Sequence, residues 1–270
     1  MTELKIVSFN IRTLYSHPLD GVNSFIHRSG MILEKIRKEA PHVICFQEIS
    51  DPIRAFLRNY LQDYIILGHG RTEDLTGEGL SIAYRKDSME LLGFESFWLS
   101  PTPYVPASRY EIQSEYPRIC PHAVLKHKDM DKPISLYNIH LDHISDEARI
   151  AGIHQITEMA KEYKEKIDCP TFIMGDFNAK PDTETITYLK EYNGGEYVDL
   201  SGDIEFTYHG FRDSATPDSG YVKEPCKIDY IFVDRETSKK PHSVTLWDDK
   251  VNGILLSDHY PVCLEIEMKY

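Results

Sequence analysis

The sequence contains one stretch, Thr171-Phe172-Ile173-Met174-Gly175-Asp176-Phe177-Asn178-Ala179, that decides how the fold is predicted. Its apolar run Phe172–Met174 predicts a fully buried strand that stops at Gly175. Asp176 and Asn178 follow two residues apart, so in extended geometry their side chains lie on the same face. A hydrophobic core would reject a carboxylate and a carboxamide. The stretch therefore predicts a site at the end of a buried strand.

The length and composition are those of an ordinary globular protein, with 270 residues of which 41% are hydrophobic and 27% charged. That length is enough for a large core, and no linker, repeat or low-complexity segment divides the chain. We therefore expect one domain over residues 1–270. No apolar run approaches the roughly 20 residues of a membrane span. Residues 1–5 begin no basic region followed by a long apolar one, so we expect no secretory signal.

The cysteines predict the redox environment. They are odd in number and widely spaced, and no Cys-x-x-Cys pair occurs among Cys45, Cys120, Cys169, Cys226 and Cys263. We expect free thiols in strands or the core, and a reduced, cytoplasmic location, rather than disulfides or zinc ligands.

The formal net charge is −13, and it restricts the partners. A protein that grips long nucleic acid usually has a basic footprint, and here the overall field would repel a polyanion. A small phosphate ester, or a local basic patch, remains compatible with this charge. Acidic groups gathered around a divalent cation would contribute to it.

The periodicity predicts about a dozen strands and four helices. The expected helices are Phe25–Glu39, Pro52–Leu61, one from the Ser145 cap to about Lys166, and a short one after Pro181-Asp182. The expected strands include Lys5–Asn10, His42–Glu48, Ile134–Leu141, Phe206–His209, Lys227–Val233 and Tyr260–Glu267. The five prolines of Ser100–Pro121 predict a long surface loop. Strands outnumber helices too far for simple βαβ alternation, so two face-to-face sheets with helices outside fit better.

Several predicted strands end in polar groups able to bind a metal or transfer a proton. These groups are Asn10, Glu48, His140, Asp142, Asp176, Asn178, Asp258 and His259. A single such residue would be explained as a turn or a cap. Asp229 is harder to explain, because it lies inside the apolar run Lys227–Val233 and an unpaired buried carboxylate is costly.

Six motifs of this chain resemble motifs of a known superfamily, and they occur in the same order. They are Ser8-Phe9-Asn10, Gln47-Glu48, Asn138-Ile139-His140-Leu141, Gly175-Asp176-Phe177-Asn178, Lys227-Ile228-Asp229-Tyr230-Ile231 and Ser257-Asp258-His259-Tyr260-Pro261. The chain resembles the endonuclease/exonuclease/phosphatase (DNase I-like) superfamily of metal-dependent phosphoesterases, in particular bacterial members of unassigned substrate. The resemblance implies an α/β fold, a four-layer α/β sandwich in which two mixed, mostly antiparallel β-sheets pack face to face with helices outside.

The resemblance also implies a metal site. Glu48 would be the main ligand of a Mg²⁺ or Mn²⁺ ion, with Asn10 and Asp258 close to it directly or through water. Asp176 would orient or deprotonate the attacking water. Asn178 would hold that water or a phosphate oxygen.

Histidines complete the implied site. His259 would donate to a non-bridging phosphate oxygen, and Asp229 would pair with His259, favouring the charged imidazole. His140 would be a second donor to the phosphate.

Four further residues each have two interpretations, one in the site and one outside it. Arg118 is similar to the family arginine that enters the site, or is a surface arginine. Glu78 is similar to the acid that pairs with the phosphate-contacting histidine, or is a turn residue. Asp142 and His143 would support the site, or belong to the loop before the Ser145 cap.

The aromatic-rich segment Glu205–Phe211 also resembles those bacterial proteins. It would stack on a base or ring of the substrate, or form a strand and a turn. We expect His209 of this segment to bind substrate.

The leading prediction is a Mg²⁺-dependent phosphoesterase in which water attacks the phosphorus of a small or short phosphorylated substrate, a monoester or a diester. The first alternative is an endo- or exonuclease cutting DNA or RNA, and short nucleic acid remains a predicted partner. The second alternative is a catalytically silent binding protein on the same fold. No protein partner is predicted.

Overall fold

The computed structural model describes residues 3–16, 20–211 and 224–268. Its helices are α1 (Phe25–Glu39), α2 (Asp51–Tyr60), α3 (Asp146–Lys166) and α4 (Glu184–Gly195). One sheet has the strand order β11 (His242–Leu246), β14 (Val262–Glu267), β1 (Glu3–Asn10), β2 (Val43–Ile49), β4 (Gly79–Arg85), β3 (Tyr64–Gly70). The other has the order β5 (Met89–Trp98), β6 (Ile119–His127), β7 (Ile134–His140), β8 (Thr171–Asp176), β10 (Asp229–Asp234), β9 (Tyr197–Asp199). A short hairpin joins β12 (Lys250–Val251) and β13 (Ile254–Leu255).

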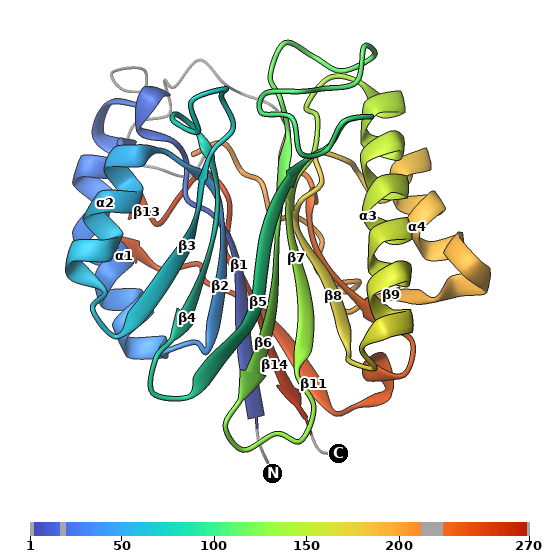
Figure 1. Cartoon of the computed structure of the whole chain (residues 1–270). Helices are drawn as coiled ribbons and strands as arrows, with labels where there is room; N and C mark the ends of the chain where they lie inside the picture. Colours follow the sequence, from blue (N-terminus) through green and yellow to red (C-terminus); the bar gives the residue numbers. More distant parts are fainter. Residues whose placement is uncertain (1–2, 17–19, 212–223, 269–270) are drawn as a thin grey trace.

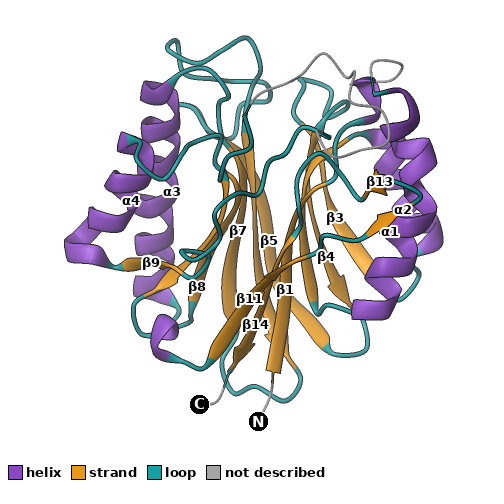
Figure 2. Ribbon diagram, turned by 180° about the vertical axis from the view of Figure 1, so that it is seen from behind, coloured by secondary structure: helices purple, strands orange, loops and turns teal. Residues whose placement is uncertain are grey.

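Both sheets are mixed. β1 pairs with β2, and β7 with β8, in parallel, and the other described pairs are antiparallel. Figures 1 and 2 show the two sheets face to face, with α1 and α2 outside one sheet and α3 and α4 outside the other. The predicted four-layer α/β sandwich is confirmed.

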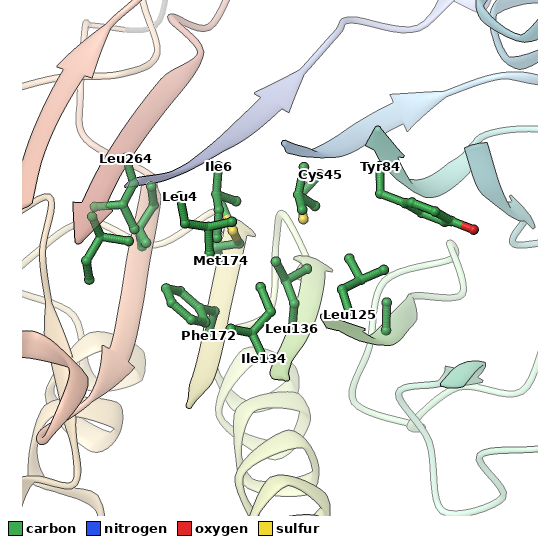
Figure 3. Close-up of a cluster of buried hydrophobic side chains, with 14 of the residues drawn as sticks. Leu4, Ile6, Cys45, Tyr84, Leu125, Ile134, Leu136, Phe172, Met174 and Leu264 are labelled. Carbon is green, nitrogen blue, oxygen red and sulfur yellow. The ribbon is translucent and has the colours of Figure 1, made fainter. Parts of the chain in front are cut away.

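Apolar side chains fill all three spaces between these layers. Between the sheets, Leu4 and Ile6 of the first sheet face Phe172 and Met174 of the second (Figure 3). Two further clusters pack α1 and α2 against the first sheet and α3 and α4 against the second. The central strands therefore bury both faces, which explains their nearly continuous apolar sequences.

The alternation of side chains along these strands positions the site. In β1, Leu4 and Ile6 point between the sheets, and the same face continues to Asn10 at the strand end. In β8, Phe172 and Met174 likewise lead to Asp176. β10 runs antiparallel to β8 and pairs its first residue, Asp229, with Asp176. Polar groups from both sheets therefore meet at one edge of the sandwich.

Buried amides link the two sheets just below that edge. Asn138 Nδ2 donates to the carbonyl oxygens of Phe46 and Ser81, each at 3.0 Å, and Gln47 Nε2 donates to Asn138 Oδ1 at 2.8 Å. Because buried polar groups need partners, these bonds hold the sheets in one relative position.

The structure differs from the sequence prediction in three places. β6 begins at Ile119, so the long loop ends sooner than expected. The strand expected at Phe206–His209 is wrong: Tyr208 makes only isolated bridges, to Cys226 and His259. Tyr208 exchanges backbone hydrogen bonds with Cys226, but the next N–H groups, of Ile228 and Asp229, donate to Thr207 Oγ1, so the ladder does not continue. Asp229 is the first residue of β10 rather than an interior one.

The predicted thiols are confirmed, since all five cysteines are free. Within the described ranges, none of the helices has the length and apolar character needed to cross a membrane.

Candidate active site

A cavity of about 710 Å³ opens at the edge where the polar strand ends meet. Nine of the residues singled out in the sequence line it: Glu48, Glu78, Arg118, His140, His143, Asp176, Asn178, Asp258 and His259. Asn10 and Asp229 lie directly behind this lining, in contact with Asp176 and His259 respectively. Asp142 and His209 are not part of the lining.

The amide of Asn10 stands between the two sheets. Its Nδ2 donates to Glu48 Oε1 at 3.1 Å and to Asp176 Oδ2 at 3.0 Å. The Arg12 backbone N–H donates to Asn10 Oδ1 at 3.1 Å. Because that N–H can only donate, the amide is oriented with its NH₂ group toward the two carboxylates.

Glu48 reaches the cavity through an irregularity in β2. The pairing of β2 with β4 shifts between Phe46 and Ile49, and Glu48 has a φ of 57°. A bulge of this kind re-aims a side chain that regular alternation would send to the helix side. Glu48 Oε2 then accepts from the backbone N–H of Thr13 at 3.1 Å.

The acidic groups fit a divalent cation. One ligand atom each from Glu48, Asp176 and His259 lies within 4.8 Å of the others. Carboxylate oxygens are the donors that Mg²⁺ and Mn²⁺ prefer. Asp258 faces the same space, and the Arg12 guanidinium lies 3.6 Å from Asp258 Oδ2 and 4.0 Å from Glu48 Oε2. The donor set is therefore suited to a hard ion, with a cation of the chain beside it.

Asp176 is buried, and its two oxygens have different surroundings. Oδ1 accepts from the Asn178 backbone N–H at 2.8 Å, while Oδ2 lies 3.5 Å from His140 Nε2 and 3.9 Å from His259 Nε2. Burial, together with the charge of Asp229, raises the pKa of Asp176 to about 7.

The backbone before Asp176 requires glycine. Gly175 has a φ of +143°, and a Cβ there would lie 2.0 Å from the carbonyl oxygen of Ile139 in β7. The close approach of β7 and β8 places His140 beside Asp176 in the register. Gly175 thus brings two predicted site residues together.

His259 is held by a buried carboxylate. Its Nδ1 lies 2.8 Å from Asp229 Oδ2, and Thr207 Oγ1 donates to the same oxygen at 2.5 Å. Burial by itself lowers the pKa of His259, but the charges of Asp229, Asp176 and Asp258 outweigh it and raise the pKa to about 10. His259 is therefore an imidazolium whose Nε2 side faces the cavity.

His140 has the opposite electrostatics. Burial lowers its pKa well below the ordinary value, and the neighbouring Arg118 and Arg71 lower it further. His140 is a neutral imidazole, able to donate one hydrogen bond. Asn178, with a φ of 49°, donates from Nδ2 to the Leu141 carbonyl oxygen at 3.1 Å and borders the same space.

Glu78 and Asp142 have the surroundings of the second of their two interpretations, a turn residue and a residue of the loop before the Ser145 cap. Glu78 pairs with Arg71 at 2.7 Å, rather than with a histidine. Asp142 accepts from the backbone N–H groups of Ser114, Ile144 and Ser145, so it ties the long loop to the start of α3.

His209 packs against Tyr260, with ring centroids 4.3 Å apart, and its Nδ1 accepts from the Phe211 N–H. Its position is behind Asp258, whose carbonyl oxygen accepts from the His209 N–H.

Several residues of the cavity were not predicted from the sequence: Arg12, Arg71 and Lys180 line it. Tyr208, which also lines it, belongs to the aromatic segment that was expected to stack on a substrate ring. Arg12 and Lys180 each follow a predicted site residue, Asn10 and Asn178, by two positions, which is a signal that could have found them. Arg71 has no comparable signal, because it enters from the hairpin between β3 and β4.

A sandwich with carboxylates and histidines gathered at one edge defines a class of phosphate-ester hydrolases. The sequence profile described as the Endonuclease/Exonuclease/phosphatase family matches residues 7–259. The chain therefore belongs to this family, whose members are hydrolases acting on phosphate esters.

Solved structures agree with this assignment. The endonuclease/exonuclease/phosphatase from Bacteroides vulgatus aligns over 100% of both chains, with a TM-score of 0.84 and 26% identity. A mannosyl-6-phosphatase from Bacteroides thetaiotaomicron aligns over 98% of this chain and 99% of its own, with a TM-score of 0.80 and 24% identity. TDP2 from D. rerio, solved with a single-strand DNA product, aligns over 99% and 100%, with a TM-score of 0.74 and 17% identity. The last two likenesses concern the fold alone.

Proposed function

We propose that the protein is a Mg²⁺-dependent phosphoesterase acting on a small or short phosphorylated substrate. The supporting observation is the pair of carboxylates Glu48 and Asp176 beside the imidazolium of His259, set in a cavity whose lining also includes Arg12, Arg71, Arg118 and Lys180. The whole chain has a net charge of −13. Positive groups are thus gathered where a phosphate would bind, while the overall field repels long polyanions.

The metal would be held by the acids at the sheet edge. Glu48 would be the main ligand, with Asp258 close by, and Mg²⁺ or Mn²⁺ would suit these carboxylate oxygens. Asn10 would lie close to the ion without binding it directly, because its NH₂ group donates to Glu48 and Asp176. Bound there, the ion would polarise a phosphoryl oxygen and assist the leaving group.

Asp176 has the position required to handle the water. The Asn178 N–H holds Oδ1, so Oδ2 is the oxygen that faces His140 and His259 across the cavity. A carboxylate fixed in this way would orient a water and accept its proton, a contribution of about 10²–10⁴-fold. Asn178 would hold a phosphate oxygen or that water.

Histidines and an arginine would neutralise the phosphate. His259, oriented by Asp229, would donate to a non-bridging oxygen, where charge develops in the transition state. His140 would donate to another oxygen as a neutral imidazole. Arg118 would add a fixed positive charge beside His140.

A screen of phosphate monoesters and diesters with Mg²⁺ and Mn²⁺ tests the proposal, with Asp176→Asn as the blank. We expect metal-dependent hydrolysis of at least one small ester, lost in Asp176→Asn and in His259→Ala while both variants keep the wild-type circular dichroism. Activity within tenfold of wild type in either variant would overturn the mechanism. Failure to hydrolyse any ester would overturn the proposal in favour of a binding protein.

A nuclease is the second candidate, and one observation favours it. Tyr15, Tyr116 and Tyr208 line the cavity, and aromatic rings of this kind stack on bases. Salt separates the two candidates, because polyanion binding weakens steeply with salt. We expect kcat/KM on a small ester to change less than about threefold between about 50 and 200 mM NaCl. The nuclease would be favoured by an activity on oligonucleotides that exceeds the activity on small esters at low salt and falls steeply as salt rises.

A further inference from the structure

Two arginines lie on one wall of the cavity, and only one of them has a task in the chemistry above. Arg71 follows directly after β3, in the hairpin of residues 71–78 that leads to β4. Arg118 ends the long loop before β6. Both guanidinium groups border the cavity, and both lie near enough to His140 to lower its pKa.

Arg118 is a buried cation that forms no ion pair with a described residue. It is 4% exposed, no described residue hydrogen-bonds to its Nε, and its Nη2 lies 3.1 Å from His143 Nδ1. Among the described residues, no carboxylate comes within ion-pair distance of it. Burial is the main reason that the pKa of Arg118 is lowered to about 10. The charge of Arg71 acts in the same direction, and the carboxylates of Glu78, Asp142 and Asp176, which lie beyond ion-pair distance, oppose it. A buried charge is stable only when it is paired, so the group is suited to an anion from outside the chain.

Arg71 is held in place before any ligand binds. Arg71 Nη1 forms an ion pair with Glu78 Oε1 at 2.7 Å. The Arg71 guanidinium also lies 4.6 Å from the centre of the Tyr116 ring. The hairpin is closed so tightly that a Cβ on Gly70 would lie 1.7 Å from the Thr76 carbonyl oxygen. Trp98 Nε1 donates to the Arg71 carbonyl oxygen at 3.0 Å. An arginine fixed by these contacts loses little entropy on binding.

The loop that carries Tyr116 and Arg118 is also fixed. Gln113 Nε2 donates to the Tyr116 carbonyl oxygen at 2.6 Å, and the Leu99 N–H donates to the Arg118 carbonyl oxygen at 2.8 Å. Asp142 accepts from the Ser114 N–H at 3.1 Å. Asp142, predicted to support the site, therefore supports this wall.

We propose that Arg71, with Tyr116 beside it, and Arg118 form a second anion subsite next to the position of the scissile phosphate, with Arg118 shared between the two phosphates because it also stands beside His140. This inference rests on the proposed function and narrows it: the preferred substrates carry a second phosphate group, as a sugar bisphosphate does. Glu78 forms an ion pair with Arg71, whereas no described carboxylate lies within ion-pair distance of Arg118, so the Arg118 charge is the one that an anion would pair with. A phosphate would accept hydrogen bonds from both arginines, which are suited to its oxygens.

The first test compares substrates that differ by one phosphate. Matched hexose monophosphates and hexose bisphosphates are hydrolysed by wild type, Arg71→Gln and Arg85→Gln. Arg85 pairs with Asp87 on the surface outside this cavity, so its variant is a matched loss of one positive charge. We expect wild type to favour the best bisphosphate by about tenfold in kcat/KM, chiefly through KM. Arg71→Gln should remove most of this preference, and Arg85→Gln should keep it.

The outcomes separate the two proposals. Hydrolysis of monophosphates and bisphosphates with equal kcat/KM, or a preference unchanged in Arg71→Gln, would overturn the subsite and leave the phosphoesterase intact. If no ester is hydrolysed, the proposed function fails, and the subsite is judged by binding alone.

The binding test needs no catalysis or metal. Calorimetry in EDTA compares methylphosphonate with methylene-, ethylene- and propylene-diphosphonate, which vary the distance between the two anions. We expect at least one diphosphonate to bind about tenfold more tightly than methylphosphonate. Arg71→Gln and the conservative Arg118→Lys should each reduce that difference. Equal affinities for all four ligands, or a difference that neither variant alters, would overturn the subsite.

Discussion

Nδ1 of His259 lies 2.8 Å from Oδ2 of Asp229, although the two residues are 30 positions apart in the sequence. The contact forms because β10 begins at Asp229 at the edge of the sandwich where the segment before β14 carries His259. Thr207 Oγ1 donates to the same carboxylate oxygen. The carboxylate that begins β10, ahead of the apolar residues Tyr230–Val233, is therefore paired, and it fixes both the charge and the orientation of a cavity histidine.

Asp229→Asn should lower activity without loss of the fold. Asparagine has the same shape, but it removes the charge that keeps His259 protonated and can favour the wrong ring orientation. We expect kcat to fall by about 10²-fold with little change in KM. Steady-state kinetics measure this. Asp234→Asn, at the other end of β10, is the control, because its contacts to Thr171 and Thr237 are structural. Asp229→Asn with more than half of the wild-type kcat would show that the pair is not used.

Glu48→Gln should lower the affinity of the site at the sheet edge for the metal ion. A carboxamide keeps the size of the side chain but lacks the negative charge that attracts a divalent cation. The Mg²⁺ concentration for half-maximal rate should rise by about tenfold or more. Removal of metal with EDTA should abolish the activity of both proteins. Glu39→Gln, at the end of α1, is the matched control, and a titration curve for Glu48→Gln that coincides with wild type would remove Glu48 from the ligand set.

Gly175→Ala should destabilise the fold strongly. The added Cβ would lie 2.0 Å from the Ile139 carbonyl oxygen, and the φ of +143° is one that alanine rarely adopts. We expect a loss of about 3 kcal/mol or more in the free energy of unfolding, because β7 and β8 must separate or bend. Urea denaturation measures it. Gly93→Ala is the control: its Cβ would meet Val124 at 3.9 Å, an ordinary contact. Similar losses in both variants would contradict the steric argument.

His42, which is not part of the cavity lining, should make the stability of the fold depend on pH. Burial lowers its pKa to about 4, and the charges of His127 and Arg85 act in the same direction. Between pH 4 and the ordinary value of about 6.5, the unfolded chain binds a proton that the folded chain does not, so this contribution to stability falls as pH falls. The ring is only half-buried, so the loss should be on the order of 1 kcal/mol.

The variant His42→Gln isolates this effect, because glutamine does not titrate and can still accept from the Lys5 N–H, as His42 Nδ1 does at 2.9 Å. The difference in unfolding free energy between wild type and His42→Gln should change between pH 7 and pH 4.5, to the disadvantage of wild type. A difference that stays constant over this range would contradict the prediction.

Much of the fold was predictable because the central strands bury both faces. In β1 and β8 the apolar pattern continues to a polar terminal residue, so Asn10 and Asp176 could be recognised from the sequence. The helix α1 was predicted with the bounds that it has, since Pro41 follows its end. The segment around Tyr208 was not, because Thr207 makes side-chain bonds to backbone groups that no periodicity reveals.

The partners of the polar groups were less predictable than their presence. Glu78 could be named from its position, but its contact with Arg71 depends on how the hairpin between β3 and β4 closes. His209 was expected to bind substrate, and it packs against Tyr260 behind Asp258 instead of lining the cavity. Contacts of this kind depend on loops, whose conformation follows from local turns and side-chain bonds rather than from a repeating pattern.

The sequence by itself determined the layers of this protein and the set of chemical groups at the strand ends, because burial imposes a period on every strand and a polar residue interrupts that period visibly. Only the tertiary structure decided which groups meet. It joined Asp229 to His259, turned Glu48 inward through a bulge, and brought Arg71 and Arg118 to one wall. These relationships cross from one element to another, and their distances follow from packing, which a linear pattern does not encode.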